Sequence, residues 1–191
     1  PNADSIYEVP LILERDRLGD KILEKFGMHA RQQSDLRAWK TFVRKIARAN
    51  RPVKIGVIGK YFATGDYVLT DSYISVIEAI KHAAVAEGLK PELRWLDSTE
   101  YEKDPKKLKE LDALDGVLVP GGFGARGVEG KIAAIKYARE HLIPSFGLCY
   151  GMQLQVIEYA RNVLGWKDAH TTEVNSATPY PVLPSSCGSP P

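Results

Sequence analysis

Residues 147–151, Gly-Leu-Cys-Tyr-Gly, have the spacing of a nucleophile elbow with Cys149 at its centre. An apolar strand expected over 143–146 precedes them, and a helix expected over 152–164 follows. Such a tight turn strains the nucleophile's backbone and leaves no room for bulky neighbours, which explains the flanking glycines. The N-terminus of the helix favours a thiolate and offers N–H groups to an oxyanion. The pattern therefore indicates a reactive cysteine rather than a small buried apolar residue.

A second loop rich in glycine, residues 120–124, follows the apolar run 116–119 and precedes another expected helix. The loop has neither the spacing of a dinucleotide fingerprint nor the Gly-Lys-Ser/Thr of a P-loop. Because ligands bind beyond the carboxyl ends of parallel strands, we expect this loop beside Cys149. It is a candidate oxyanion hole, and the alternative of a turn shaped by geometry alone stays open.

A thiolate nucleophile also needs a base, and the chain has four histidines. His29 lies near the N-terminus, His82 within an expected helix, and His141 at the opposite edge of the sheet from Cys149. We place His170 in a loop, as the one histidine expected near the nucleophile. The sequence thus supplies a nucleophile and an oxyanion loop without a clear base.

These loops are positioned by successive strand–helix units. We expect strands over 53–59, 93–96, 116–119 and 143–146, and helices over 17–26, 35–49, 71–88, 105–111, 129–141 and 152–164. This alternation predicts an α/β fold with a doubly wound, mostly parallel sheet covered by helices on both faces.

The composition of the chain limits which partners and sites it is expected to have. The 191 residues are 44% hydrophobic and carry a formal charge of +2, which favours neither nucleic acid nor any other polyanion as a partner. Basic side chains on the helix at 35–49 indicate a solvated face. The two cysteines, Cys149 and Cys187, predict neither a metal site nor a disulfide framework, and we expect a cytoplasmic protein without a signal peptide or a membrane span.

Several segments resemble class I glutamine amidotransferases and, more narrowly, the CTP synthase family. They occur in the family's order at 5–10, 59–61, 71–79, 118–131, 147–153 and 160–165, with Thr172 and Glu173. The resemblance covers about 4–182 and implies a C-terminally truncated, flavodoxin-like glutaminase fold.

The resemblance implies that Cys149 attacks L-glutamine and forms a cysteinyl-glutamyl intermediate, releasing ammonia. It also implies a glutamine-binding set that contains no metal ligand: Gly122, Phe123, Tyr150, Gly151, Met152, Gln153 and Glu173. A carboxylate such as Glu173 suits the α-ammonium group of glutamine. Position 150 is usually leucine in the family and is tyrosine here.

Complete family members are ligases that form a C–N bond, aminating UTP to CTP with ATP and Mg²⁺ in a synthetase domain, and they assemble as homotetramers. The resemblance implies four segments: 1–16 as the end of the synthetase domain, 17–52 as a helical linker, 53–182 as a partial amidotransferase domain, and 183–191 as an unrelated tail. The partial domain needs no cofactor of its own. The family's catalytic His and Glu lie beyond this sequence, so we expect a weak or inactive glutaminase.

Two alternatives remain from the residues themselves. A cysteine hydrolase or stress protein of the DJ-1 type also carries a cysteine elbow on a doubly wound sheet. A module without catalytic activity that binds partners through the helix at 35–49 is the other.

Overall fold

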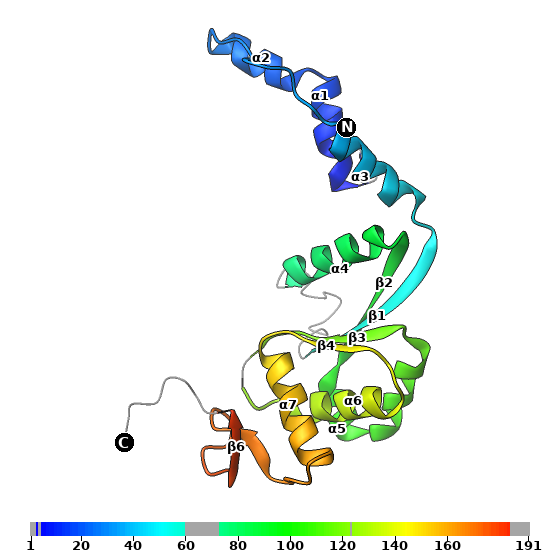
Figure 1. Cartoon of the computed structure of the whole chain (residues 1–191), viewed down its shortest axis with the longest axis vertical. Coiled ribbons are helices and arrows are strands. Elements are labelled where there is room, and N and C mark those ends of the chain that lie inside the picture. Colours follow the sequence, from blue (N-terminus) through cyan, green and yellow to red (C-terminus); the bar gives the residue numbers. More distant parts are fainter. Residues whose placement is uncertain (1–2, 4, 60–72, 123, 184–191) are drawn as a thin grey trace. The chain divides into compact units, whose positions relative to one another are not determined.

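The structure, a computed structural model, describes residues 3, 5–59, 73–122 and 124–183 (Figure 1). The chain divides into two units, residues 1–51 with 82–90 and residues 52–81 with 91–191. Its elements are η1 (Ile6–Glu8), α1 (Val9–Arg15), α2 (Leu18–Lys25), α3 (Arg37–Arg48), β1 (Arg51–Gly59), α4 (Ile74–Ala86), β2 (Leu89–Asp97), α5 (Ser98–Lys103), η3 (Pro105–Ala113), β3 (Gly116–Val119), α6 (Val128–Glu140), β4 (Ser145–Gly147), α7 (Tyr150–Asn162), β5 (Ala169–Thr171) and β6 (Tyr180–Leu183). No helix in the described ranges is long and apolar enough to cross a membrane.

An aromatic cluster organises the first unit. The Tyr7 ring packs edge-on against Phe42, and the indole N–H of Trp39 donates to the Tyr7 carbonyl oxygen at 2.8 Å. The hydroxyl of Tyr7 lies 2.7 Å from Nε2 of His82. These contacts join the start of the chain to α3 and to the C-terminal half of α4. His82 therefore has a partner within this unit.

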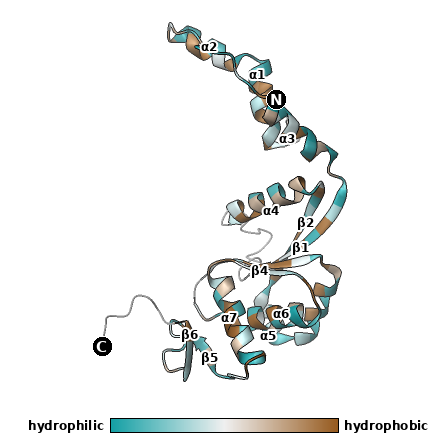
Figure 2. Cartoon of the chain, viewed as in Figure 1, coloured by the Kyte–Doolittle hydropathy of each residue, from teal (hydrophilic) through white to brown (hydrophobic). Residues whose placement is uncertain are grey.

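The second unit contains a four-stranded sheet in the order β2-β1-β3-β4. Strand β3 pairs in parallel with β1, placing Ile55 opposite Gly116, and with β4, placing Val119 opposite Gly147. One face packs against α5, η3, α6 and α7, and the other against α4. Figure 2 shows the hydrophobic residues on α6 and α7. The predicted doubly wound α/β architecture is confirmed, with β3 as an interior strand.

Several element boundaries differ from the sequence prediction. Helix α5 was not predicted, and it begins because the Asp97 carboxylate accepts hydrogen bonds from the Thr99 N–H and hydroxyl groups, both at 2.8 Å. Residues 105–113 form a 3₁₀ helix, and β2 runs over nine residues rather than four. Helix α7 begins two residues early, at Tyr150, because Cys149 is its N-cap.

The segment after α7 also differs from expectation. Strands β5 and β6 form a separate parallel pair, so the expected loop around His170 is wrong: His170 lies within β5. The expected tail over 183–191 begins too early, because Leu183 ends β6 and pairs with Thr171, whereas residues 184–191 lie outside the described residues. The first two residues of the helix expected over 71–88 also lie outside them.

Candidate functional site

Cys149 lies at the turn between β4 and α7. Its backbone has φ 50° and ψ −111°, a conformation that side-chain-bearing residues rarely adopt, and the residue is exposed. The N–H groups at the start of a helix have no helical acceptors, and the helix dipole favours negative charge there. The geometry is that of the predicted elbow, with an accessible thiol at a helix N-terminus.

The glycines on either side of Cys149 permit close backbone contacts. A side chain at Gly147 would lie 2.5 Å from the carbonyl carbon of Gly151, and one at Gly151 would overlap the carbonyl oxygen of Val119. The Leu148 N–H donates to that same Val119 oxygen at 2.9 Å. The spacing of the two glycines thus reflects how tightly the elbow lies against β3.

The glycine-rich loop after β3 lies beside Cys149, as its position in the sequence predicted. A Cβ atom at Gly121 would lie 3.6 Å from Cβ of Cys149, whereas one at Gly122 would lie 3.7 Å from Nζ of Lys131. Successive glycines therefore face the nucleophile and a lysine. Phe123 lies outside the described residues.

Tyr150 is turned into the protein and is 4% exposed. Nζ of Lys131, itself 3% exposed, lies 6.0 Å from the centre of the Tyr150 ring. Among the described residues the Tyr150 hydroxyl has no hydrogen-bond partner. Burial raises the pKa of Tyr150, and the negative charges of Glu173 and Glu129 raise it further. Sequence reasoning missed Lys131, because a lysine on an amphipathic helix usually lies on the solvated face.

The remaining predicted glutamine-binding residues follow Cys149 or β5. Gly151 is buried, Met152 is 47% exposed, and Gln153 is half-buried, its N–H donating to the Cys149 carbonyl oxygen at 3.2 Å. Glu173 is exposed in the turn after β5, where its N–H donates to the Thr171 hydroxyl at 3.3 Å. The electrostatic influence of Glu173 on Tyr150 links this turn to the start of α7.

No hydrogen bond between described residues joins a histidine to Cys149. His170 is 8% exposed, and its Nδ1 accepts a hydrogen bond from the Thr171 N–H at 2.9 Å. Burial lowers the pKa of His170, and the charge of Arg161 lowers it further. His141 stacks on the Tyr137 ring at the end of α6, at the other end of β4 from Cys149. The structure therefore identifies no base beside the nucleophile among these residues.

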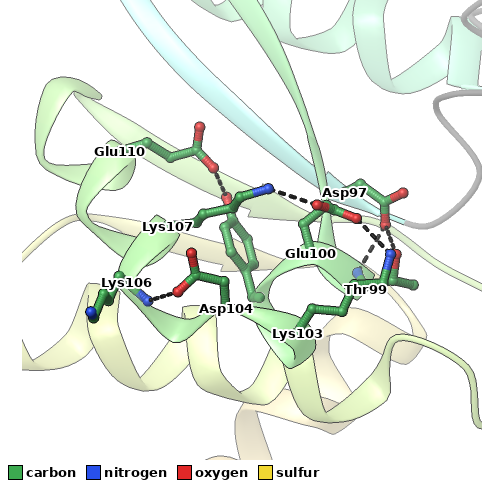
Figure 3. A network of polar contacts seen from close by, with 9 residues as sticks. Asp97, Thr99, Glu100, Lys103, Asp104, Lys106, Lys107 and Glu110 are labelled. Atoms are coloured by element: carbon green, nitrogen blue, oxygen red, sulfur yellow. Dashed lines mark hydrogen bonds and ion pairs between the residues drawn. The ribbon is translucent and has the colours of Figure 1, made fainter.

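A cluster of charged residues lies on β2, α5 and η3 (Figure 3). Part of this cluster, including Glu100 and Lys107, lines a surface hollow of about 480 Å³. Glu100 accepts hydrogen bonds from Lys103 at 2.8 Å and Lys107 at 2.6 Å, which lower the pKa of Glu100 to about 2. The Asp104 carboxylate caps η3 by accepting from the Lys106 N–H at 3.0 Å. The cluster is therefore explained by a helix cap at Asp104 and by ion pairs within and between the two short helices. The described residues include no group of three or more metal-ligating side chains.

Comparison with known proteins identifies a family model and several similar proteins. The family model described as glutamine amidotransferase class-I matches residues 68–181. CTP synthase from Pyrococcus abyssi is 48% identical over 182 residues, which is 95% of this chain and 32% of that protein. CTP synthase from Sulfurisphaera tokodaii is 51% identical over 182 residues, covering 95% of this chain and 33% of that protein.

A solved structure is also similar. The glutaminase domain of Trypanosoma brucei CTPS with bound acivicin superposes with a TM-score of 0.63 at 40% identity, covering 69% of this chain and 49% of that one. The present chain spans about a third of the length of the curated relatives that it matches.

Proposed function

Because the chain belongs to the class-I glutamine amidotransferase family, we propose that it carries the nucleophile and oxyanion part of a glutaminase site that acts on L-glutamine. The observation that carries this proposal is the exposed Cys149 thiol at a strained helix N-terminus, directly against the glycine-rich loop at Gly121. This arrangement suits attack on an amide carbonyl.

In the proposed reaction, the Cys149 thiolate adds to the side-chain amide carbon of glutamine. N–H groups of the loop around Gly122 and of Tyr150 stabilise the oxyanion. The C–N bond then breaks, and ammonia leaves with a proton from solvent or a base, which gives a cysteinyl-glutamyl thioester. Water hydrolyses the thioester to glutamate and restores the thiol. Gln153 and Glu173 contact the amino-acid head group, with Phe123, Gly151 and Met152 beside it.

The wider activity is also a proposal. Its support is the similarity to CTP synthases, of which this chain matches about a third. The released ammonia would aminate UTP to CTP with ATP and Mg²⁺ in a homotetrameric cytoplasmic enzyme. Residues 1–16 would then end its synthetase part, 17–52 would link the two parts, and 53–182 would form the glutaminase part.

We propose slow turnover for this chain alone. Hydrogen bonds of three described histidines go to groups other than Cys149, and no hydrogen bond between described residues joins a histidine to its thiol. Losing the base of a nucleophile–base pair costs several orders of magnitude in kcat, whereas substrate binding and the contribution of the oxyanion hole are retained.

The test uses a diazo ketone analogue of glutamine and mass spectrometry of the whole chain. We expect one adduct per chain, located at Cys149, slowed by excess glutamine and absent from Cys149→Ala. Cys187 is the internal control and should stay unlabelled. Equal labelling of both cysteines, or labelling that glutamine does not slow, would contradict a glutamine site and favour a thiol hydrolase or stress protein.

Ammonia release from glutamine is measured on the same samples. Turnover that Cys149→Ala abolishes would show that a base acts within this chain. Labelling of Cys149 with slow or no turnover is the expected result.

A further inference from the structure

Lys131 is a buried cation next to the glycine-rich loop. It lies in α6 (Val128–Glu140), is 3% exposed, and brings Nζ to 3.7 Å from the position that a Cβ atom would take at Gly122. Burial of an ammonium group is costly unless its surroundings compensate for lost hydration. The groups around Lys131 must therefore stabilise its buried charge.

Tyr150 supplies one of those groups. Its ring centre lies 6.0 Å from Nζ of Lys131, within the range of a cation–π contact. Tyr150 is the first residue of α7 and follows Cys149 directly. The ammonium group of Lys131 thus lies close to the loop at Gly122 and to the first residue of α7, and both of these lie next to the nucleophile.

The glycine-rich loop lies between Cys149 and Lys131. The Cβ direction of Gly121 points toward Cys149, and that of Gly122 points toward Lys131. An ammonium group attracts the carbonyl ends of nearby peptide dipoles, which turns their N–H ends away from it. On the Cys149 side, outward N–H groups are what an oxyanion requires.

We propose that Lys131 is a positioning residue that holds the glycine-rich loop at 121–122 in its oxyanion-binding conformation. In this arrangement the Tyr150 ring stabilises the ammonium group of Lys131 through a cation–π contact. The contact of Lys131 with the loop does not depend on the activity of the protein. Its catalytic consequence rests on the proposed glutaminase function.

The first test measures amide hydrogen exchange at Gly121 and Gly122 by NMR in the full chain. Lys131→Met should speed exchange at both glycines about tenfold, and Lys131→Arg, which keeps the cation, should stay near the wild-type rate. Lys136→Met on the same helix is the matched control and should change neither rate. Unchanged exchange in Lys131→Met, or an equal change in Lys136→Met, would overturn the proposal.

A second variant covers the case in which Lys131→Met fails to fold. Tyr150→Leu keeps the cation and removes the aromatic face, so exchange at the two glycines should rise by several-fold. Exchange as slow as in the wild type would also overturn the proposal.

The second test compares two reagents for the Cys149 thiol. Lys131→Met should slow labelling by the diazo ketone about tenfold, because that reagent needs the oxyanion loop, and should change the iodoacetamide rate by less than about twofold. Equal slowing of both reagents would indicate a general structural effect and count against the proposal. A wild type that the diazo ketone does not label would contradict the glutaminase function, while the exchange measurement would still decide the role of Lys131.

Discussion

The two edges of the described sheet differ in chemistry. Along edge strand β2, exposed charged side chains alternate with half-buried ones, and Pro91, Glu92 and Arg94 are features that discourage pairing with another strand. Edge strand β4 has three residues, and its central Phe146 is 62% exposed. The β2 edge thus carries charged side chains and a proline, whereas the β4 edge is short and exposes an aromatic ring.

The helix next to β4 extends this contrast. Met152, Val156 and Tyr159 are spaced for one face of α7, the C-cap Val163 continues that spacing, and each is between 39% and 51% exposed. The opposite face of the same helix is buried against the sheet through residues such as Leu154 and Ile157. Contiguous exposed apolar side chains of this kind mark surfaces that associate. The β4–α7 side of the sheet, which bears the nucleophile, therefore exposes more apolar surface than the β2 side and is the side expected to associate.

The largest expected effect comes from Gly151→Ala, which breaks the β4 side alone. The new methyl group would overlap the Val119 carbonyl oxygen, so we expect a loss of about 2–3 kcal/mol in the free energy of unfolding, measured by urea denaturation. Gly19→Ala, where no atom lies within 4 Å of the new Cβ, is the control and should not destabilise the chain. Equal stability of Gly151→Ala and the wild type would contradict the described elbow.

Phe146→Lys would give the β4 edge a charged side chain, as the β2 edge has. We expect the wild type to self-associate at high concentration through the β4 side, and the lysine to raise the concentration needed about tenfold, measured by sedimentation velocity. Arg94→Leu on β2 is the converse variant and should increase association. If Phe146→Lys associates as readily as the wild type, the apolar surface near β4 is not what drives association.

The two sides should also respond to pH in different windows. The folded-state pKa of His170 beside α7 is lowered, so the unfolded chain binds more protons, and stability should fall as pH drops through about 6.5. The pKa of Glu100 beside β2 is about 2, so the stability from its lysine pairs is present above its ordinary pKa and is lost as pH falls from about 4.5 toward 2.

Urea denaturation between pH 7 and 5 separates these contributions. His170→Gln should flatten the pH dependence in this range, whereas Glu100→Gln should leave it unchanged. The reverse pattern would mean that the titrating groups have been assigned to the wrong sides.

Tyr150→Phe gives the smallest expected effect. It removes a buried hydroxyl without a hydrogen-bond partner among the described residues and keeps the ring near Lys131. We expect stability to be unchanged or to rise by about 0.5–1 kcal/mol in the same urea measurement. A loss of more than about 1 kcal/mol would show that the hydroxyl has a stabilising partner.

Local spacing was sufficient to predict the strands that position the site. Strand β3 and the elbow at Cys149 carry signals in adjacent residues, an apolar run and a glycine pair, because close backbone packing excludes other residue types. Helix α5 escaped prediction because its cap, Asp97, also ends a strand, and so the residues resembled a turn.

The buried polar residues could not be predicted in the same way. Burial of Lys131 depends on α6 and α7 lying together, and placement of His170 in a strand depends on β6, some ten residues farther along the chain. Such features arise from tertiary contacts, which no local pattern of residues specifies.

The unequal sequence separation of the strand pairs bears on the order of folding. Strand β3 meets β4 across roughly thirty residues, but meets β1 across about sixty, with β2 formed in between. Each doubling of a loop adds about 0.6 kcal/mol to the entropic cost of closure, and pairings distant in sequence form slowly. We therefore expect the nucleophile-bearing half of the sheet to assemble first and the docking of β1 to be the later, slower step.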